Sequence, residues 1–257
     1  MTQSPILKVL FTFRKFGVRN LLIGGQACII YGAAEFSRDS DFVVLCETDN
    51  LIRLKKALRA LRARNIYVPA LEKKFLDKGH ACHFRCSARQ VKNLRIDILS
   101  KLRGCGDFAA LWQKRTTVKF PGKKENKIEV IGLSDLVQSK KTQRDKDWLM
   151  LNRLIENDIH LTARRSPEKI KWWLNECRNP NTLIILARRY RSLTNQIMKT
   201  RLSLKAALSH EPIKLQKLLA REEMIEREKD KEYWAPLRAE LERLRHVKIS
   251  KQARTKD

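Results

Sequence analysis

The chain has 257 residues, and its 55 lysines and arginines against 28 aspartates and glutamates give a formal net charge of +27. Apolar residues make up 43% of the sequence and no stretch approaches the roughly 20 apolar residues of a membrane span, which argues against a largely disordered or membrane-spanning chain. The positive excess is spread over both halves of the sequence. It predicts a polyanionic partner, with nucleic acid the first candidate and an anionic membrane surface the second.

Helix and strand patterns alternate in the first part of the chain. In order, we expect a helix over residues 4–17, a strand at 20–23, a helix at 26–33, a strand at 41–47, a helix over 49–63 and strands at 80–87 and 94–100. Asp49 or Asn50 is the expected N-cap of the helix over 49–63. The order predicts an α/β (α+β) fold with a mixed β-sheet flanked by helices.

The remainder of the chain changes character. Residues 127–136 are typical of a strand that runs into a helix, and Ser134 is the expected N-cap of one helix continuing to residue 151. Strand patterns then stop, and the segments at 166–178, 181–208 and 212–246 all favour helix. We therefore expect three parts, namely an α/β domain over 1–158, a helical domain over 159–248 and a loose basic tail over 249–257.

Three aspartates occupy similar positions beside apolar runs. Asp39 and Asp41 open a strand in "SRDSDFVVL" and share one face because side chains alternate along a strand, and Asp97 lies within the strand "NLRIDILS". If the strand of Asp97 pairs beside the strand of Asp41, the three carboxylates meet at one place in the sheet. Carboxylate oxygens are the hard ligands that Mg²⁺ takes, together with water and substrate phosphates. The pattern predicts a site for Mg²⁺, or for Mn²⁺ in its place.

Two glycines come just before the first aspartate pair in the expected fold. Gly24 and Gly25 follow a strand and precede a helix, so their backbone amides can approach a phosphate group. The same arrangement is also a common way to turn a corner. It is neither the three-glycine dinucleotide fingerprint nor a P-loop, which needs Gly-Lys-Ser/Thr.

These residues together resemble the polymerase-β-like nucleotidyltransferase superfamily. The family has a strand, Gly-Gly or Gly-Ser, a helix, Asp-x-Asp at the start of the next strand and a third Asp on a later strand. The sequences "GG", "DSD" and "RIDIL" match that order over roughly residues 20–150. The closer resemblance is to minimal nucleotidyltransferases of abortive-infection and toxin–antitoxin systems, whose later Ser/Thr-Lys and Arg-x-Lys-Asp are matched by "SKKTQRDKDW".

The resemblance implies a role for each matched residue. Asp39 and Asp41 would bind the metal, and Asp97 would be the third carboxylate, a metal ligand that also orients or deprotonates the attacking group. Gly24 and Gly25 would line the triphosphate.

A lysine, an arginine and an aspartate further along the chain have implied roles as well. Lys140 would contact the phosphates, supported by Arg144 and Asp147. In a helix these three residues would share one face by their i, i+4, i+7 spacing. Lys141 and Asp145 would form a neighbouring structural pair.

A cluster of cysteines and histidines admits a different interpretation. The segment "HACHFRC" holds His80, Cys82, His83 and Cys86, which raises the possibility of zinc. Strand alternation places Cys82 and Cys86 on one face and His83 on the other, so the ligands would diverge. We therefore favour buried strand thiols. The six cysteines have no framework spacing, and we expect them to be reduced.

The expected function is a Mg²⁺-dependent nucleotidyltransferase in which an acceptor hydroxyl attacks the α-phosphate of a nucleoside triphosphate. The charge and the resemblance favour an RNA or tRNA end as acceptor, while a protein hydroxyl or a small molecule also fits. A cognate antitoxin protein is an expected partner, a membrane is not, and the expected location is the cytoplasm. The alternative is a catalytically inactive nucleotidyltransferase-fold protein that binds nucleic acid or a partner protein. Antibiotic modification is less favoured, since a basic surface repels cationic aminoglycosides.

Overall fold

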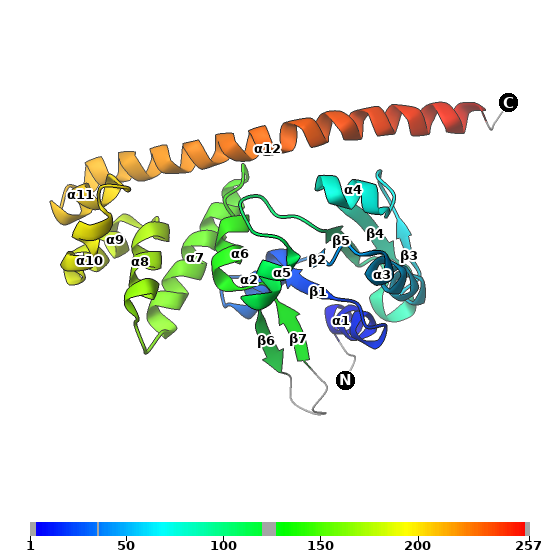
Figure 1. Ribbon diagram of the computed structural model, residues 1–257, viewed down its shortest axis with the longest axis horizontal. Helices are drawn as coiled ribbons and strands as arrows, with labels where there is room; N and C mark the ends of the chain where they lie inside the picture. The colour runs from blue at the N-terminus through cyan, green and yellow to red at the C-terminus, as the bar shows by residue number, and fades with distance from the viewer. Residues whose placement is uncertain (1–3, 35, 120–126, 255–257) are drawn as a thin grey trace. The chain divides into compact units, whose positions relative to one another are not determined.

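The computed structural model describes residues 4–34, 36–119 and 127–254, with side-chain surroundings given up to residue 247 (Figure 1). The chain divides into two compact units. The first unit draws on residues 1–30, 34–139 and 232–257, and the second on residues 31–33 and 140–231. The division near residue 140 precedes the predicted boundary at 158, and the last part of the chain returns to the first unit.

A seven-stranded mixed sheet organises the described part of the first unit, as the α/β prediction required. Its strands in chain order are β1 (Asn20–Ile23), β2 (Asp39–Val44), β3 (Ala63–Asn65), β4 (Cys82–Cys86), β5 (Arg95–Leu99), β6 (Thr116–Lys119) and β7 (Lys127–Val130). Across the sheet their order is β3-β4-β5-β2-β1-β7-β6. The pairs β2–β5 and β1–β7 are parallel, and the other neighbours are antiparallel.

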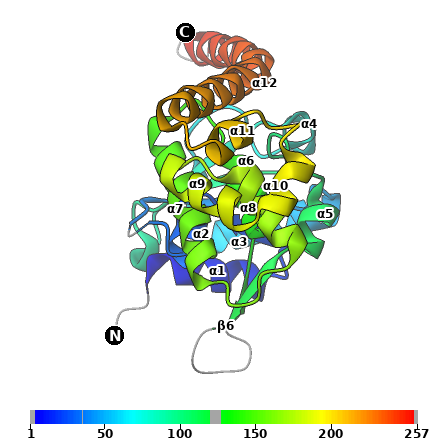
Figure 2. The same cartoon turned by 90° about the vertical axis from the view of Figure 1, so that its left-hand side faces the viewer.

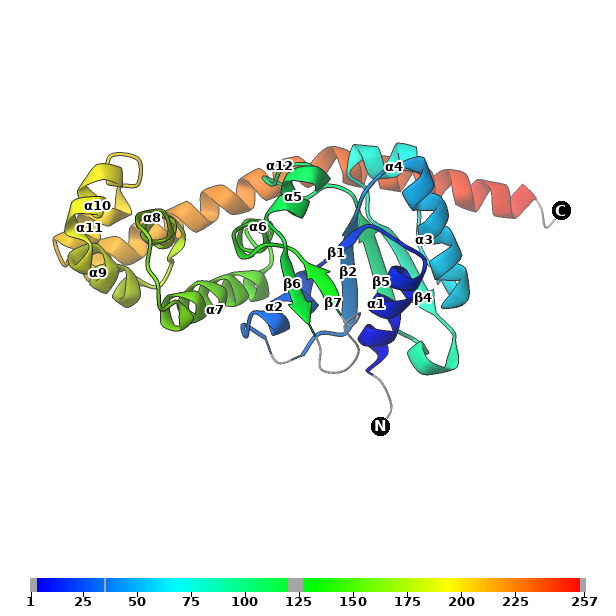
Figure 3. The ribbon, with the colours of Figure 1, turned by 60° about the horizontal axis from the view of Figure 1, so that its bottom comes forward.

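Short helices accompany the sheet. They are α1 (Pro5–Lys15), α2 (Gly24–Ile30), α3 (Thr48–Ala60), α4 (Lys73–Lys78), α5 (Phe108–Gln113) and α6 (Leu133–Ser139). Figure 3 shows α1 and α3 side by side near β4 and β5. The apolar side of α1 supplies Phe13, whose ring centroid lies 4.9 Å from that of Phe42 on β2. Both rings are fully buried, so α1 is fixed on the strand that carries the aspartate pair.

The expected cap of α3 is wrong. The helix begins at Thr48, and Glu47 at the N-cap position makes no side-chain cap hydrogen bond. Asn50 is instead fully buried, where its amide donates to the carbonyls of Arg19 and Leu45 and accepts from the Arg19 N–H. A contact with the start of β1 has therefore replaced a local cap, because the buried amide satisfies three backbone groups there.

In the described residues of the second unit, the regular secondary structure is helical. It contains α7 (Asp145–Leu161), α8 (Pro167–Glu176), α9 (Pro180–Arg189), α10 (Arg191–Ile197), α11 (Ser203–Leu208) and the first part of α12 (Pro212–Arg254) (Figure 2). Asp158 on α7 accepts a hydrogen bond from the indole of Trp173, which is fully buried on α8. This contact ties α7 to the helical unit and explains why the division falls before it.

Two expectations for the helices need correction. The helix expected over 181–208 is three helices, because the buried Arg201 donates to the carbonyls of Leu174 and Cys177 and pairs with Glu222, which fixes the chain between α10 and α11. The loose tail expected over 249–257 is helical as far as Arg254, and its last three residues lie outside the described residues. No pattern local to these segments signals either outcome.

Candidate functional site

The three predicted carboxylates come together in the sheet of the first unit. β2 and β5 pair in parallel with Asp41 directly opposite Asp97, and Asp39 opposite Arg95. Residues opposite one another in paired strands point to the same side of the sheet, so Asp39, Asp41 and Asp97 share one face. The pairing on which the sequence analysis made the site conditional is therefore present.

Gly24 makes room for the Asp41 carboxylate. Ile23 at the end of β1 is the register partner of Asp41, and α2 begins at the next residue. A Cβ atom at Gly24 would overlap the Asp41 side chain, and the backbone there has φ +66°, which favours glycine. The glycine is thus required by the carboxylate beside it.

Gly25 meets the segment just before the aspartate pair. A Cβ at Gly25 would overlap the Ser37 hydroxyl, and the Gln26 amide donates to the Ser37 carbonyl at 3.0 Å. The Ser37 hydroxyl in turn donates to the carbonyl of Asp39 at 3.2 Å. The start of α2 therefore fixes the backbone that presents Asp39. Ser37 was not among the residues expected at the site, although its position two residues before Asp39 could have indicated it.

Asp97 is held by two neighbouring side chains. It is 8% exposed, and its Oδ1 accepts from Arg95 Nε at 2.9 Å and lies 2.9 Å from His83 Nδ1. Burial by itself would raise the pKa of Asp97, but the hydrogen bonds and charges of His83 and Arg95 outweigh it and hold the pKa below its ordinary value. Asp97 is therefore ionised at neutral pH.

His83 contacts both the Asp97 carboxylate and the Arg95 guanidinium. Its Nδ1 also lies 3.1 Å from an Arg95 NH2 group. Because a guanidinium only donates and a carboxylate only accepts, Nδ1 can satisfy Asp97 when protonated or Arg95 when not. Sequence alternation had placed His83 on the exposed side of β4, but only the β4–β5 register puts it opposite Asp97.

The fit of a divalent metal to these residues is mixed. Three carboxylates on adjacent strands are the right donor chemistry for Mg²⁺. Among the described residues, however, no group of three or more His, Cys, Asp or Glu side chains stands ready to hold a metal ion. The cation at Asp97 in this arrangement is the Arg95 guanidinium. Asp39, Asp41 and Asp97 are the residues that would hold the metal, and in this structure the Asp97 carboxylate is bonded to Arg95 and His83.

Lys140, Arg144 and Asp147 lie in the second unit, and the continuous helix expected around them is wrong. α6 ends at Ser139 and α7 begins at Asp145, so Lys140 and Arg144 are not helical, and Ser134 lies inside α6 rather than capping it. The helical i, i+4 spacing expected to pair Lys141 with Asp145 does not form, because Lys141 precedes the start of α7.

Both members of that expected pair have other partners within the second unit. Lys141 contacts Glu176 at 2.8 Å, and Asp145 contacts Arg227 at 2.7 Å. Helical spacing did not bring Lys141 and Asp145 together, because Lys141 precedes the start of α7.

Lys140, Arg144 and Asp147 nevertheless meet. Asp147 is 1% exposed and accepts from Lys140 Nζ at 2.9 Å, from the Thr142 hydroxyl at 2.7 Å and from Arg144 Nε at 2.7 Å. Burial would raise the pKa of Asp147, and the Lys140 charge with these hydrogen bonds lowers it below its ordinary value. Lys140 is itself buried, so Arg144, with a side chain 61% exposed, is the member that faces solvent.

The cysteine and histidine cluster follows strand alternation. Cys82 and Cys86 are buried on one face of β4, where burial raises the pKa of their thiols to about 12 and about 11. His80 is buried and contacts Glu240 on α12 at 3.1 Å. These thiols are buried and protonated, as the sequence analysis favoured.

Comparison with known proteins adds no family to this geometry. No family model matches the chain, and no curated protein matches it either. Across the described residues, no helix combines the length and apolar character needed to cross a bilayer. The candidate site therefore stands on its own residues.

Gly24→Ala tests the close approach of Asp41. Because the new methyl group overlaps the carboxylate in an already strained backbone, we expect a loss of about 1–3 kcal/mol in the free energy of unfolding beyond that of Gly17→Ala. Gly17 is the matched control, since it has the same φ of +66° but its Cβ would meet only Arg53 at an ordinary 3.5 Å. Urea unfolding of both variants measures the difference, and equal losses would contradict the close approach.

Asp97→Asn tests the charge at the third carboxylate. A carboxyl whose pKa is lowered on folding stabilises the protein above its unfolded pKa of about 3.9, and this contribution disappears as the pH falls through the lower folded value. We expect the variant to be about 1–3 kcal/mol less stable than wild type at pH 6, with the gap closing below about pH 4. Urea unfolding against pH measures it. A gap that is constant with pH would contradict the assignment, and Asp49→Asn, at an exposed carboxylate, controls for charge loss.

Lys140→Met tests the buried ion pair of the second unit. Asp147 would keep its burial and lose its buried cation, and we expect about 3–5 kcal/mol of destabilisation by urea unfolding. Arg144→Gln, at the exposed side of the same carboxylate, should cost under about 1 kcal/mol. If the two substitutions cost the same, Lys140 is not the principal partner of Asp147.

Proposed function

We propose that this protein is a Mg²⁺-dependent nucleotidyltransferase that moves a nucleoside monophosphate from a nucleoside triphosphate to a hydroxyl acceptor. The observation that supports the proposal most is the register of β2 and β5, which sets Asp41 opposite Asp97 with Asp39 on the same face. Like charges in adjacent strands repel, so the pairing of Asp41 with Asp97 does not serve to stabilise the sheet.

The chemistry suits what the carboxylates provide. Bound Mg²⁺ would neutralise charge on the transferring phosphoryl group and activate the attacking oxygen. Asp39 and Asp41 would be ligands, each fixed by its backbone, with Gly24 leaving space for the Asp41 side chain. In-line positioning of the acceptor hydroxyl against the triphosphate would supply much of the rate acceleration that the metal does not supply.

Asp97 suits metal binding better than proton abstraction. A carboxyl with a lowered pKa is fully ionised at neutral pH, which a ligand needs, but it is a weak proton acceptor. Arg95 and His83 would hold Asp97 until metal and nucleotide arrive, and Arg95 would then be released towards the triphosphate. We therefore assign Asp97 to metal binding and orientation of the acceptor hydroxyl.

The resemblance to toxin-type nucleotidyltransferases suggests how the nucleotide would be held. Gly24 and Gly25 would line the triphosphate by their backbone amides. The resemblance also implies a phosphate-contacting role for Lys140 with Arg144 and Asp147. Within the second unit, Arg144 is the member of this cluster that faces solvent, and Lys140 and Asp147 form a buried pair. A net charge of +27 favours an RNA or tRNA end as acceptor, in a cytoplasmic toxin–antitoxin or phage-defence setting with a cognate antitoxin protein.

A specific observation favours the alternative, a catalytically inactive member that binds nucleic acid or a partner protein. The Arg95 guanidinium bonds to Asp97, and no three-residue metal group is assembled in the described part of the chain. In an inactive protein this arrangement would be permanent, and Arg95 would neutralise a carboxylate left without a metal.

Nucleotide transfer is the decisive test. Purified protein with Mg²⁺, each α-³²P nucleoside triphosphate and total cellular RNA is expected to label RNA, or the protein itself, and Mn²⁺ is expected to substitute. Asp39→Ala/Asp41→Ala should reduce labelling by at least about 100-fold, because both proposed ligands are removed. Glu47→Ala/Asp49→Ala removes two exposed carboxylates and should label as wild type does.

Two results would go against the proposal. Labelling that persists in Asp39→Ala/Asp41→Ala would mean that the activity lies elsewhere or comes from a contaminant. The absence of label with every nucleotide, while wild type and variant bind RNA equally, would favour the inactive binder.

A further inference from the structure

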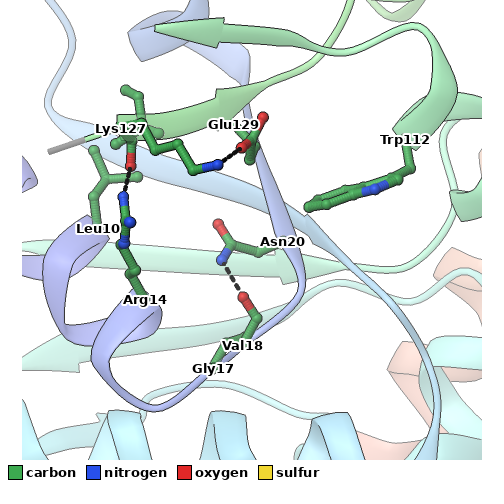
Figure 4. A pocket seen from close by; sticks show the side chains of 9 residues that line it. Leu10, Arg14, Gly17, Val18, Asn20, Trp112, Lys127 and Glu129 are labelled. Carbon is green, nitrogen blue, oxygen red and sulfur yellow. Dashed lines mark hydrogen bonds and ion pairs between the residues drawn. The ribbon is translucent and has the colours of Figure 1, made fainter. Parts of the chain in front are cut away.

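A small cavity lies in the first unit, away from the carboxylates. It has a volume of about 240 Å³ and is bounded by α1, the chain leading into β1, the start of β7 and Trp112 on α5 (Figure 4). Leu10, Val18 and Ile128 are buried and form its apolar floor. Drug-sized ligands occupy about 300–1,000 Å³, so this cavity suits something smaller, such as one planar ring system.

Trp112 forms one wall, and its neighbours hold it in place. The Arg115 guanidinium lies 4.2 Å from the indole centroid, donates to the Trp112 carbonyl at 2.6 Å and donates to Glu129 at 2.9 Å. The Phe108 ring is stacked at 5.6 Å from Trp112 on the same helix. Within the described part of the chain the indole N–H makes no hydrogen bond. The aromatic surface is thus pre-positioned, which lowers the entropy lost when a ring stacks on it.

The rim of the cavity is polar and basic. Figure 4 shows Arg14 and Trp112 on opposite sides with Asn20 between them. The Asn20 amide donates to the Val18 carbonyl at 2.9 Å, which leaves its carbonyl oxygen and a second N–H for a ligand. Arg14 donates to the carbonyl of Lys127 at 3.0 Å.

The charges around the cavity favour an anion. Arg19 lies 5.8 Å from the Trp112 ring and is exposed, and the Lys127 side chain is half exposed. Glu129 is the acid of the lining, and it is already paired with Arg115 at 2.9 Å. A ring-sized slot with an aromatic wall, an amide at its edge and cations around it has the chemistry of a site for a base attached to phosphates.

We propose that this cavity binds one unpaired base of a single-stranded nucleic acid. Trp112 stacks on the base, Asn20 hydrogen-bonds its edge, and Arg14, Arg19 and Lys127 contact the neighbouring phosphates. A duplex is excluded as ligand because its bases are already stacked and paired. Binding here requires neither metal nor nucleoside triphosphate.

The cavity lies apart from the carboxylates. Asn20 at the start of β1 pairs with Val44, whereas Asp41 pairs with Ile23 at the end of the strand. Side chains alternate along a strand, so Asn20 and Asp41 point to opposite faces of the sheet as well as lying at opposite ends of β1. The binding inferred here is therefore independent of the proposed function.

The test measures binding separately from catalysis. Fluorescence anisotropy of a labelled single-stranded RNA is recorded in EDTA, without nucleoside triphosphate, using the Asp39→Ala/Asp41→Ala protein as the parent. Trp112→Leu keeps apolar volume but removes stacking and should weaken binding by ~10-fold. Asn20→Ala should weaken it by a few-fold, and Arg14→Gln should lower the dependence of log Kd on log salt by about one phosphate contact.

Matched control variants separate binding at the cavity from binding through the overall positive charge of the protein. Trp172 is half-buried with Lys169 Nζ 4.8 Å from its ring, and Arg64 is exposed on β3. Trp172→Leu should bind as the parent does, and Arg64→Gln should leave the stacking contribution intact. Single-stranded DNA is expected to compete within a few-fold of RNA, because stacking and phosphate contacts do not need the ribose hydroxyl, and duplex RNA is expected to compete poorly.

Some outcomes would overturn the inference. Parent-like binding by both Trp112→Leu and Asn20→Ala, or equal competition by duplex RNA, would do so. If Trp112→Leu does not fold by circular dichroism, Trp112→Phe, Asn20→Ala and Arg14→Gln decide the question. Binding that depends on Trp112 in a protein without transfer activity would refute only the proposed function, and transfer by a protein whose RNA binding is insensitive to Trp112 and Asn20 would refute only this inference.

Discussion

The parallel pairing of β2 with β5 is the constraint on which the candidate site depends. It sets Asp41 against Asp97, two like charges in adjacent strands, and the surrounding structure compensates for their repulsion. Arg95 pairs with Asp97, His83 Nδ1 lies beside the same carboxylate, and Gly24 gives the Asp41 carboxylate a place that any larger residue would occupy. The fold thus retains a destabilising pair and adds specific contacts to hold it, which is the pattern expected of a site kept for chemistry.

Three carboxylates that are wholly or partly removed from solvent lie close to cations. Asp97 has Arg95, Asp147 has Lys140 and Arg144, and Glu222 has Arg201 and Arg178. In each case burial would raise the pKa of the carboxyl, and the neighbouring cations lower it below its ordinary value. Both units therefore place part of their positive charge inside, beside ionised carboxylates, and leave the remaining cations for a polyanion outside.

The two ends of β1 offer complementary chemistry. At one end Gly24 meets Asp41, in a carboxylate environment suited to metal and phosphate, and at the other Asn20 borders the cavity of Trp112. The two regions face opposite sides of the sheet, because Asn20 pairs with Val44 and Asp41 pairs with Ile23, and side chains alternate along a strand.

The sequence by itself determined the order of α1, β1, α2, β2, α3, β4 and β5, the shared face of Asp39 and Asp41, and the buried thiols of β4, because alternation and apolar runs are local properties. The tertiary structure alone decided that β5 lies beside β2, that His83 faces Asp97, that Asn50 serves β1 instead of capping α3, and that the chain leaves the helix between Ser139 and Asp145. Each of these depends on contacts between residues far apart in the chain, or on a buried side chain such as Asp147 that satisfies several groups at once. Local periodicity carries no information about such partners.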